Sequence, residues 1–154
     1  MAVRLYLGVE GFLIHRTYRA DGARRGYMMT RYGLKFLRWT SLGFDCRWLT
    51  RLNREGLDYR IRRAFRIALE CPNPSSDLDF LFELVDTTYW ETHMVEAIDL
   101  ERDFFWITNE LDNFSRNVLE RRRLTDRLIV SPPLDRPADI ANIQLRLESF
   151  YDHG

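Results

Sequence analysis

The sequence predicts an α/β fold, a three-layer Rossmann-like domain in which a parallel β-sheet is flanked by helices. Three observations support this prediction. Short apolar runs of strand length alternate with segments of helical periodicity, the links between them are short, and the apolar runs end in polar residues. A length of 154 residues with 45% hydrophobic residues is typical of one globular domain, so we expect a single domain over residues 1–154.

The first predicted strand, Val3–Val9, is a nearly unbroken apolar run, which is typical of a central strand covered on both faces. Residues 16–31 follow as a polar, arginine-rich stretch that contains Gly22 and Gly26. This composition indicates an exposed excursion over the carboxyl end of the sheet, either a small hairpin or a solvated loop.

Residues 32–70 supply a helix, a strand and a second helix. Tyr32–Ser41 has helical periodicity, and Gly43 follows it at a position where glycine commonly ends helices. Phe44–Thr50 is the second predicted strand, and a polar turn follows it. Arg54–Glu70 is the clearest helix of the chain, because apolar residues line one face and arginines line the other.

The second half of the chain repeats this alternation after a break at residues 71–76, which contain two prolines. Leu78–Val85 is ambiguous between a helix and a strand. The remaining predicted elements are a short helix at Glu91–Ile98, a strand at Asp103–Asn109, a helix at Asn113–Arg122 capped by Asp112 or Asn113, a strand at Arg127–Val130 and a last helix at Pro137–Phe150. Because the strands are parallel, we expect their carboxyl ends at one edge, where such sheets hold their sites.

The net charge of zero hides an asymmetry along the chain. Residues 1–70 carry 15 basic and 6 acidic side chains, whereas residues 71–154 carry 8 basic and 17 acidic ones. A molecule polarised in this way can pair with a second copy of itself or bind a charged protein. The alternative is that the two halves lie side by side and neutralise each other. A nucleic-acid role would rest on the arginine-rich first half alone, so we do not favour it.

No apolar run approaches the ~20 residues that a membrane-spanning helix needs. The first residues, Met1–Arg4, lead directly into a predicted strand and lack the pattern of a cleaved signal peptide. We therefore expect a cytoplasmic protein without a membrane partner.

Three short motifs lie at the ends of predicted strands. Leu5–Gly11 is an apolar run that ends in an acid and a glycine, Phe44–Thr50 ends in Trp-Leu-Thr, and Ala97-Ile98-Asp99 precedes Phe104-Phe105-Trp106. In type, order and separation, these motifs resemble those of the haloacid dehalogenase (HAD) superfamily, and more narrowly small bacterial HAD-like domains. The resemblance implies a HAD-like domain over residues 1–154, with a flap at residues 16–31.

The resemblance also implies a set of functional positions. HAD phosphatases use a nucleophilic aspartate, a second acid two residues later, a phosphate-binding hydroxyl, a lysine and metal-binding acids. In this order, the positions are occupied by Gly8, Glu10, Thr50, Met94 and the pair Thr108 and Asn109. The nucleophile, the cation and at least one metal ligand are therefore missing together.

This loss predicts a chain without metal-dependent phosphatase activity. We expect no cofactor, and we do not expect Mg²⁺ to bind. The leading hypothesis is a catalytically degenerate HAD-like domain that binds another protein or itself, as a pseudoenzyme, a regulator or an assembly subunit. One alternative is a domain that binds a phosphorylated small molecule or nucleotide through Glu10, Gly11, Thr50, Arg24 and Arg25. The other is a residual hydrolase that uses Glu10.

Overall fold

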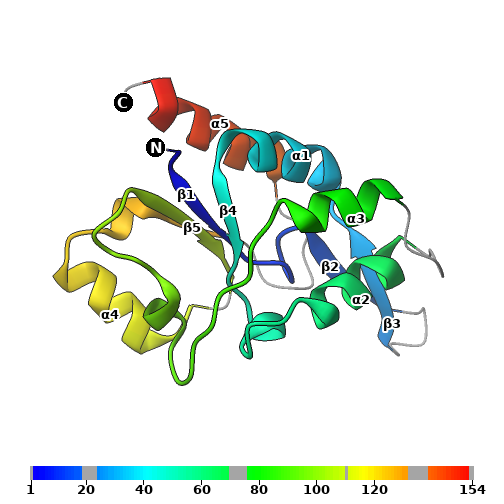
Figure 1. The fold of residues 1–154 in the computed structure, drawn as a ribbon, viewed down its shortest axis with the longest axis horizontal. Helices are drawn as coiled ribbons and strands as arrows, with labels where there is room; N and C mark the ends of the chain where they lie inside the picture. Colours follow the sequence, from blue (N-terminus) through cyan, green and yellow to red (C-terminus); the bar gives the residue numbers. More distant parts are fainter. Residues whose placement is uncertain (1, 19–23, 70–75, 110, 132–138, 153–154) are drawn as a thin grey trace.

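The computed structural model describes residues 2–18, 24–69, 76–109, 111–131 and 139–152, of which 17, 18, 24, 25, 76–78, 151 and 152 are described by their backbone alone (Figure 1). A four-stranded parallel sheet in the order β4–β1–β5–β6 forms its centre. The strands are β1 (Arg4–Leu7), β4 (Asp45–Trp48), β5 (Phe104–Thr108) and β6 (Leu128–Val130). The predicted α/β class is confirmed, and each strand lies within its expected range.

The two faces of the sheet pack against separate apolar clusters. Side chains alternate along β1, so that Leu5 and Leu7 join one cluster and Tyr6 joins the other. The first cluster is covered by α1 (Gly33–Gly43), α2 (Tyr59–Ala68), α3 (Ser76–Glu83) and α5 (Ile140–Asp152). The second is covered by α4 (Asn113–Arg121) and the 3₁₀ helix η2 (Met94–Ala97). Figure 1 shows α1 and α5 on one side of the sheet and α4 on the other, so helices flank both faces as predicted.

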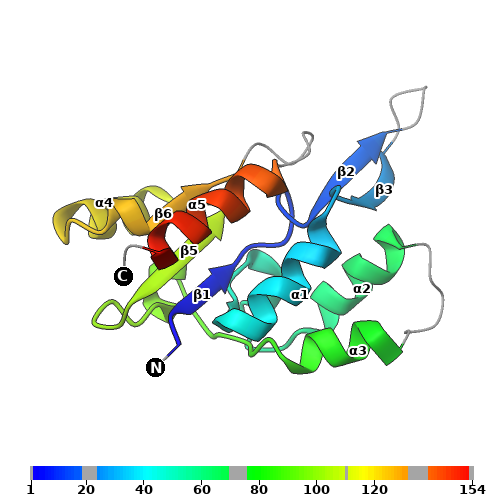
Figure 2. The ribbon, with the colours of Figure 1, turned by 90° about the horizontal axis from the view of Figure 1, so that it is seen from above.

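The excursion after β1 is an antiparallel hairpin of β2 (Ile14–Tyr18) and β3 (Arg24–Met29). Of the two alternatives for residues 16–31, the structure therefore shows the hairpin, which starts two residues earlier. Figure 2 shows the hairpin extending away from the central sheet at the carboxyl end of β1. It packs beside α2, and a Cβ atom placed on Gly26 of β3 would lie 3.6 Å from Cγ2 of Ile67.

The helix predicted at Arg54–Glu70 starts five residues later than expected, since the structure has α2 beginning at Tyr59. Gly56 has a φ of 83°, in the left-handed region that residues with side chains rarely adopt. This glycine separates α2 from the preceding 3₁₀ helix η1 (Arg51–Asn53). Leu57 lies inside the predicted helix, where its spacing from Ile61 placed it on the apolar face, but it precedes α2 and its side chain is exposed. Glu70 lies outside the described residues.

The helix predicted at Glu91–Ile98 is also shorter than expected, because only η2 is helical. The Glu96 carboxylate accepts backbone hydrogen bonds from Thr92 at 3.0 Å and His93 at 3.1 Å. These bonds form a capping box that fixes the start of η2 at Met94.

The remaining helices differ only at their ends. The ambiguous segment Leu78–Val85 is helical as far as Glu83, where α3 ends, and Leu84 and Val85 lie in the turn that follows. The first helix begins at Gly33 because Tyr32 is its N-cap. The last helix begins at Ile140, and Pro137 lies outside the described residues. Within the part of the chain that the structure describes, no helix is both long and apolar enough to cross a membrane.

Candidate functional site

The carboxyl ends of β4, β1 and β5 meet at one edge of the sheet. Leu7 of β1 is paired with Trp48 on one side and Ile107 on the other. Backbone bonds continue past the strands, since Gly8 N–H donates to Ile107 O at 2.7 Å and Leu49 N–H donates to Leu7 O at 2.9 Å. The structure therefore brings Gly8, Thr50 and Thr108 to the same edge, as expected for the carboxyl ends of parallel strands.

Gly8 lies against the backbone of β5. A Cβ atom at this position would lie 2.9 Å from the carbonyl oxygen of Ile107 and 3.3 Å from Cα of Thr108. Contacts this short with backbone atoms are relieved only when one strand shifts. The backbone of β5 therefore gives a steric reason for glycine at position 8, which the resemblance would assign to the nucleophile, and it closes the space for an aspartate side chain there.

The Glu10 side chain is directed to the hairpin that follows it. Its carboxylate accepts a hydrogen bond from the Tyr27 hydroxyl at 3.3 Å and lies 3.5 Å from Nη2 of Arg16. Only 11% of the side chain is exposed. Gly11 continues the turn with a φ of 78° and donates its N–H to Ile14 O at 2.8 Å. Glu10 thus joins β1 to the hairpin, and this position favours a structural role over proton transfer.

Thr50 is fully buried, and it begins η1 as part of a capping box with Asn53. Its hydroxyl accepts the Leu52 N–H at 3.3 Å, and its own N–H donates to Oδ1 of Asn53 at 2.8 Å. A hydroxyl in this setting stabilises the turn. It is turned inward, away from any ligand at the surface.

Asn53 is the residue at this edge that the sequence interpretation missed. Its amide nitrogen donates to Trp48 O at 3.0 Å and Thr88 O at 3.1 Å, and the Thr88 hydroxyl donates to Trp48 O at 2.6 Å. Asn53 therefore ties the end of β4 to the segment after α3. The Thr-x-x-Asn spacing of the capping box was the available signal, but the interpretation treated residues 51–53 as a polar turn only.

The other expected positions are not arranged as a metal or phosphate site. Met94 is buried in the apolar cluster that also contains Trp106, and Thr108 is buried at the end of β5. Asn109 is half-buried. Across the residues described, no group of three or more His, Cys, Asp or Glu side chains is placed to hold a metal ion. The absence of a cofactor stays a prediction, and the side chains of Arg24 and Arg25 lie outside the description.

No protein-family model matches the chain, and no curated protein matches it. Any functional assignment therefore rests on the residues themselves and on the motif resemblance.

Asp112 caps the helix α4, which follows the end of β5. Its carboxylate accepts the Ser115 N–H at 2.7 Å and the Ser115 hydroxyl at 2.8 Å, and it lies 3.5 Å from Nδ1 of His93. The His93 ring is stacked on Phe114, with 4.1 Å between the ring centroids. Partial burial by itself raises the pKa of Asp112, but the two bonds from Ser115 and the nearby His93 outweigh it and hold the pKa below its ordinary value.

Replacing Asp112 by alanine is expected to lower the free energy of unfolding at pH 7 by about 1–2 kcal/mol, the usual cost of a lost N-cap. Because the folded-state pKa of Asp112 is depressed, its stabilisation is fully present above the ordinary pKa of 3.8 and is lost as the pH falls through the lower folded-state value. Urea unfolding of both proteins at several pH values should show a constant difference above about pH 5 that shrinks below about pH 4. Glu120→Ala, an exposed change on the same helix, is the control and should show no such loss. A difference that grew on acidification would contradict the assignment.

A hollow of about 430 Å³ opens beside η1, between the start of α2 and the segment that contains Trp90. Its lining includes Arg51, Arg54, Arg60 and Tyr59. From the sequence, these arginines are expected only along the helix predicted at Arg54–Glu70 and in the polar turn before it. The chain places these groups around one hollow only because Gly56 turns the segment between η1 and α2, which periodicity did not reveal.

Proposed function

We propose that the chain is a non-catalytic HAD-like domain that acts by binding a protein partner. The main support for the loss of catalysis is the position of Gly8 against the β5 backbone, where a Cβ atom would lie 2.9 Å from Ile107 O. No residue at that position can attack phosphorus without a shift of the strands.

The other two motif residues support the same conclusion. Glu10 is held by Arg16 and Tyr27, and the Thr50 hydroxyl caps a turn inside the molecule. A phosphorylated ligand bound at this edge would have to displace these contacts. We therefore favour protein binding over the alternative of a phosphate site at Thr50.

An apolar surface across α1, α3 and α5 supports protein binding. Figure 2 shows these three helices side by side. Leu42 on α1 is 82% exposed, Phe80 on α3 is 58% exposed and Leu145 on α5 is 63% exposed. Shallow hollows of about 490 and 310 Å³ lie between α1 and each neighbouring helix. Exposed apolar side chains gathered over hollows are typical of protein interaction sites.

The charges beside this surface indicate the chemistry of the partner. Lys35 and Arg38 are exposed on α1 and line the two hollows. Among the described residues, neither has a carboxylate within 4.0 Å. The partner surface should therefore combine apolar side chains with acidic ones.

The catalytic half of the proposal predicts no phosphatase activity. With an aryl phosphate and Mg²⁺ the purified protein should release product at the rate of buffer, because a lost covalent nucleophile costs many orders of magnitude in rate. Turnover that disappears in Glu10→Gln would show that the chain is an enzyme.

Binding of a protein partner is tested by using the tagged chain as bait in cells that express it naturally. A stoichiometric protein partner, or a dimer seen by light scattering, should be lost in the double variant Leu42→Glu/Phe80→Glu. Met28→Glu is the matched control, because Met28 is an exposed apolar residue on the hairpin. A strictly monomeric protein that retains no partner, or equal loss in the control, would contradict binding through this surface.

A further inference from the structure

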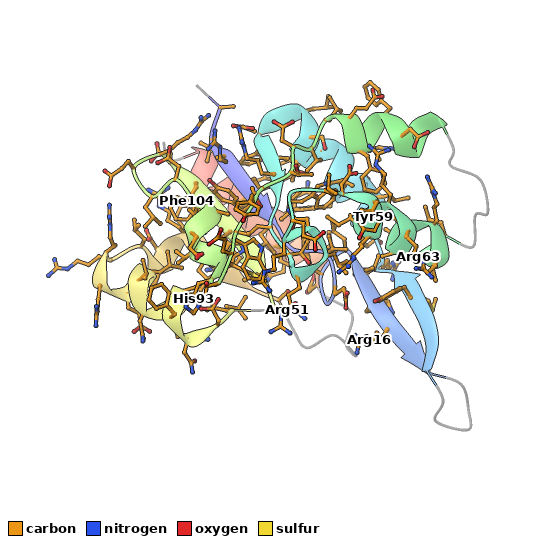
Figure 3. All side chains as sticks on the ribbon, turned by 60° about the horizontal axis from the view of Figure 1, so that its bottom comes forward. Arg16, Arg51, Tyr59, Arg63, His93 and Phe104 are labelled. Carbon is orange, nitrogen blue, oxygen red and sulfur yellow. The ribbon has the colours of Figure 1, made fainter. Side chains whose placement is uncertain are left out.

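A second hollow adjoins the one beside η1. It has a volume of about 530 Å³ and lies between α2 and the hairpin strand β3, lined by Tyr27, Arg63 and Ile67 among others. The two hollows share Leu52, Tyr59 and Arg60. Together they form one groove, the arginine groove, which runs from Trp90 past η1 and along α2. In Figure 3 the labelled Arg51, Tyr59 and Arg63 follow one another along it, with His93 on the other side of Arg51.

Three arginines of the groove have no acidic partner among the described residues. Of the described residues, none places a carboxylate within 4.0 Å of Arg54, Arg60 or Arg63. Arg62, one position from Arg63 on the same helix, is paired with Asp58 at 3.0 Å and Asp79 at 3.5 Å. Of the described residues that line the two hollows, Glu55 is the one acid. A net positive groove therefore persists in a chain of zero net charge.

Aromatic rings hold two of these guanidinium groups in place. Arg54 lies over Trp90, with 5.2 Å from its Cζ atom to the ring centroid, and donates to the backbone oxygen of Glu91. Arg60 lies over Tyr59 at 5.6 Å and donates from Nε to the Tyr59 hydroxyl at 3.1 Å. These contacts orient the two cations without neutralising them, so that they stay available to an anion.

The groove also offers a surface on which a planar group can stack. Tyr59 is 53% exposed at the junction of the two hollows, and Leu52 and Ile67 supply apolar walls. Arginines that follow a groove, with an exposed aromatic ring between them, are the combination that single-stranded nucleic acids require. The cations contact successive phosphates, and the ring stacks on a base.

We propose that the arginine groove binds single-stranded nucleic acid. A lone phosphate would occupy one hollow, whereas two adjoining open hollows suit a chain of nucleotides. An acidic peptide would use the arginines but would have no planar group for Tyr59. Among the described residues, none lines both this site and the two hollows of the apolar surface on α1, α3 and α5, so the site stands independently of the proposed protein partner.

Fluorescence anisotropy with a labelled 12-nucleotide single strand tests the proposal at several salt concentrations. About three phosphate contacts should give a slope of roughly −2 in log affinity against log salt. Arg60→Gln/Arg63→Gln should weaken binding about tenfold or more at low salt and make that slope shallower by about 1.4. Tyr59→Ala should weaken binding by about fivefold or more while leaving the slope unchanged.

The matched control is Arg116→Gln/Arg121→Gln, which removes two exposed charges from α4. It should bind like the original protein, and circular dichroism should show that every variant is folded. Inorganic polyphosphate added as a competitor should displace the strand only weakly. No binding, equal weakening in the control, or a Tyr59→Ala protein that binds normally and is displaced by polyphosphate would overturn the proposal.

Discussion

Replacing Gly8 by alanine is expected to lower the free energy of unfolding by about 2–3 kcal/mol, as overpacking of a closed position does. The added methyl group would lie 2.9 Å from the carbonyl oxygen of Ile107, and backbone cannot move aside as a flexible side chain can. Gly8 also donates its N–H to that same oxygen at 2.7 Å, so a shift of either strand would lengthen this bond. Urea unfolding, followed by tryptophan fluorescence, measures the change.

Gly43→Ala is the matched control for this substitution. Gly43 ends α1 and has no heavy atom within 4 Å of an added Cβ, so stability should stay unchanged or rise by up to about 1 kcal/mol. Gly8→Asp should be less stable than Gly8→Ala, because it adds a desolvated carboxylate to the steric strain. It should also show no phosphatase activity. A stable Gly8→Asp protein that hydrolyses an aryl phosphate would show that the site only lacks its nucleophile.

Replacing Asn53 by alanine is expected to lower the free energy of unfolding by about 2–4 kcal/mol, because buried polar groups lose their partners. The change removes the acceptor for Thr50 N–H and the donor to the carbonyl oxygens of Trp48 and Thr88. All of these groups are in the interior at the end of β4, where water does not replace the lost bonds. Urea unfolding gives the difference directly.

Asn117→Ala is the control for Asn53, because Asn117 is an exposed residue of α4. It should change the free energy of unfolding by less than about 0.5 kcal/mol. Asn53→Asp is a stricter test, since it keeps the acceptor for Thr50 but replaces the donor with a charged acceptor. It should be at least as unstable as Asn53→Ala. An Asn53→Ala protein as stable as the original would show that the bonds at the end of β4 contribute little.

Periodicity predicted the parts of the fold that burial determines. The nearly unbroken apolar run Val3–Val9 predicted a central strand covered on both faces, and both faces of the sheet are covered at β1. Periodicity failed to predict where a helix starts when a backbone conformation or a single polar side chain determines that start. Gly56, with its φ of 83°, separated η1 from α2, and Glu96 fixed the start of η2. Apolar spacing does not report a left-handed glycine or a capping carboxylate.

The sequence by itself determined that residue 8, which the motif resemblance assigns to a nucleophile, is glycine and that the first half of the chain is basic. Only the tertiary structure decided what these facts mean. The approach of β5 closes the space beside Gly8, because parallel pairing places Ile107 O within 2.9 Å of any Cβ there. In the same way, Arg51 and Arg54 line one hollow with Tyr59 across the turn at Gly56, and their closeness depends on a backbone angle that apolar spacing does not report.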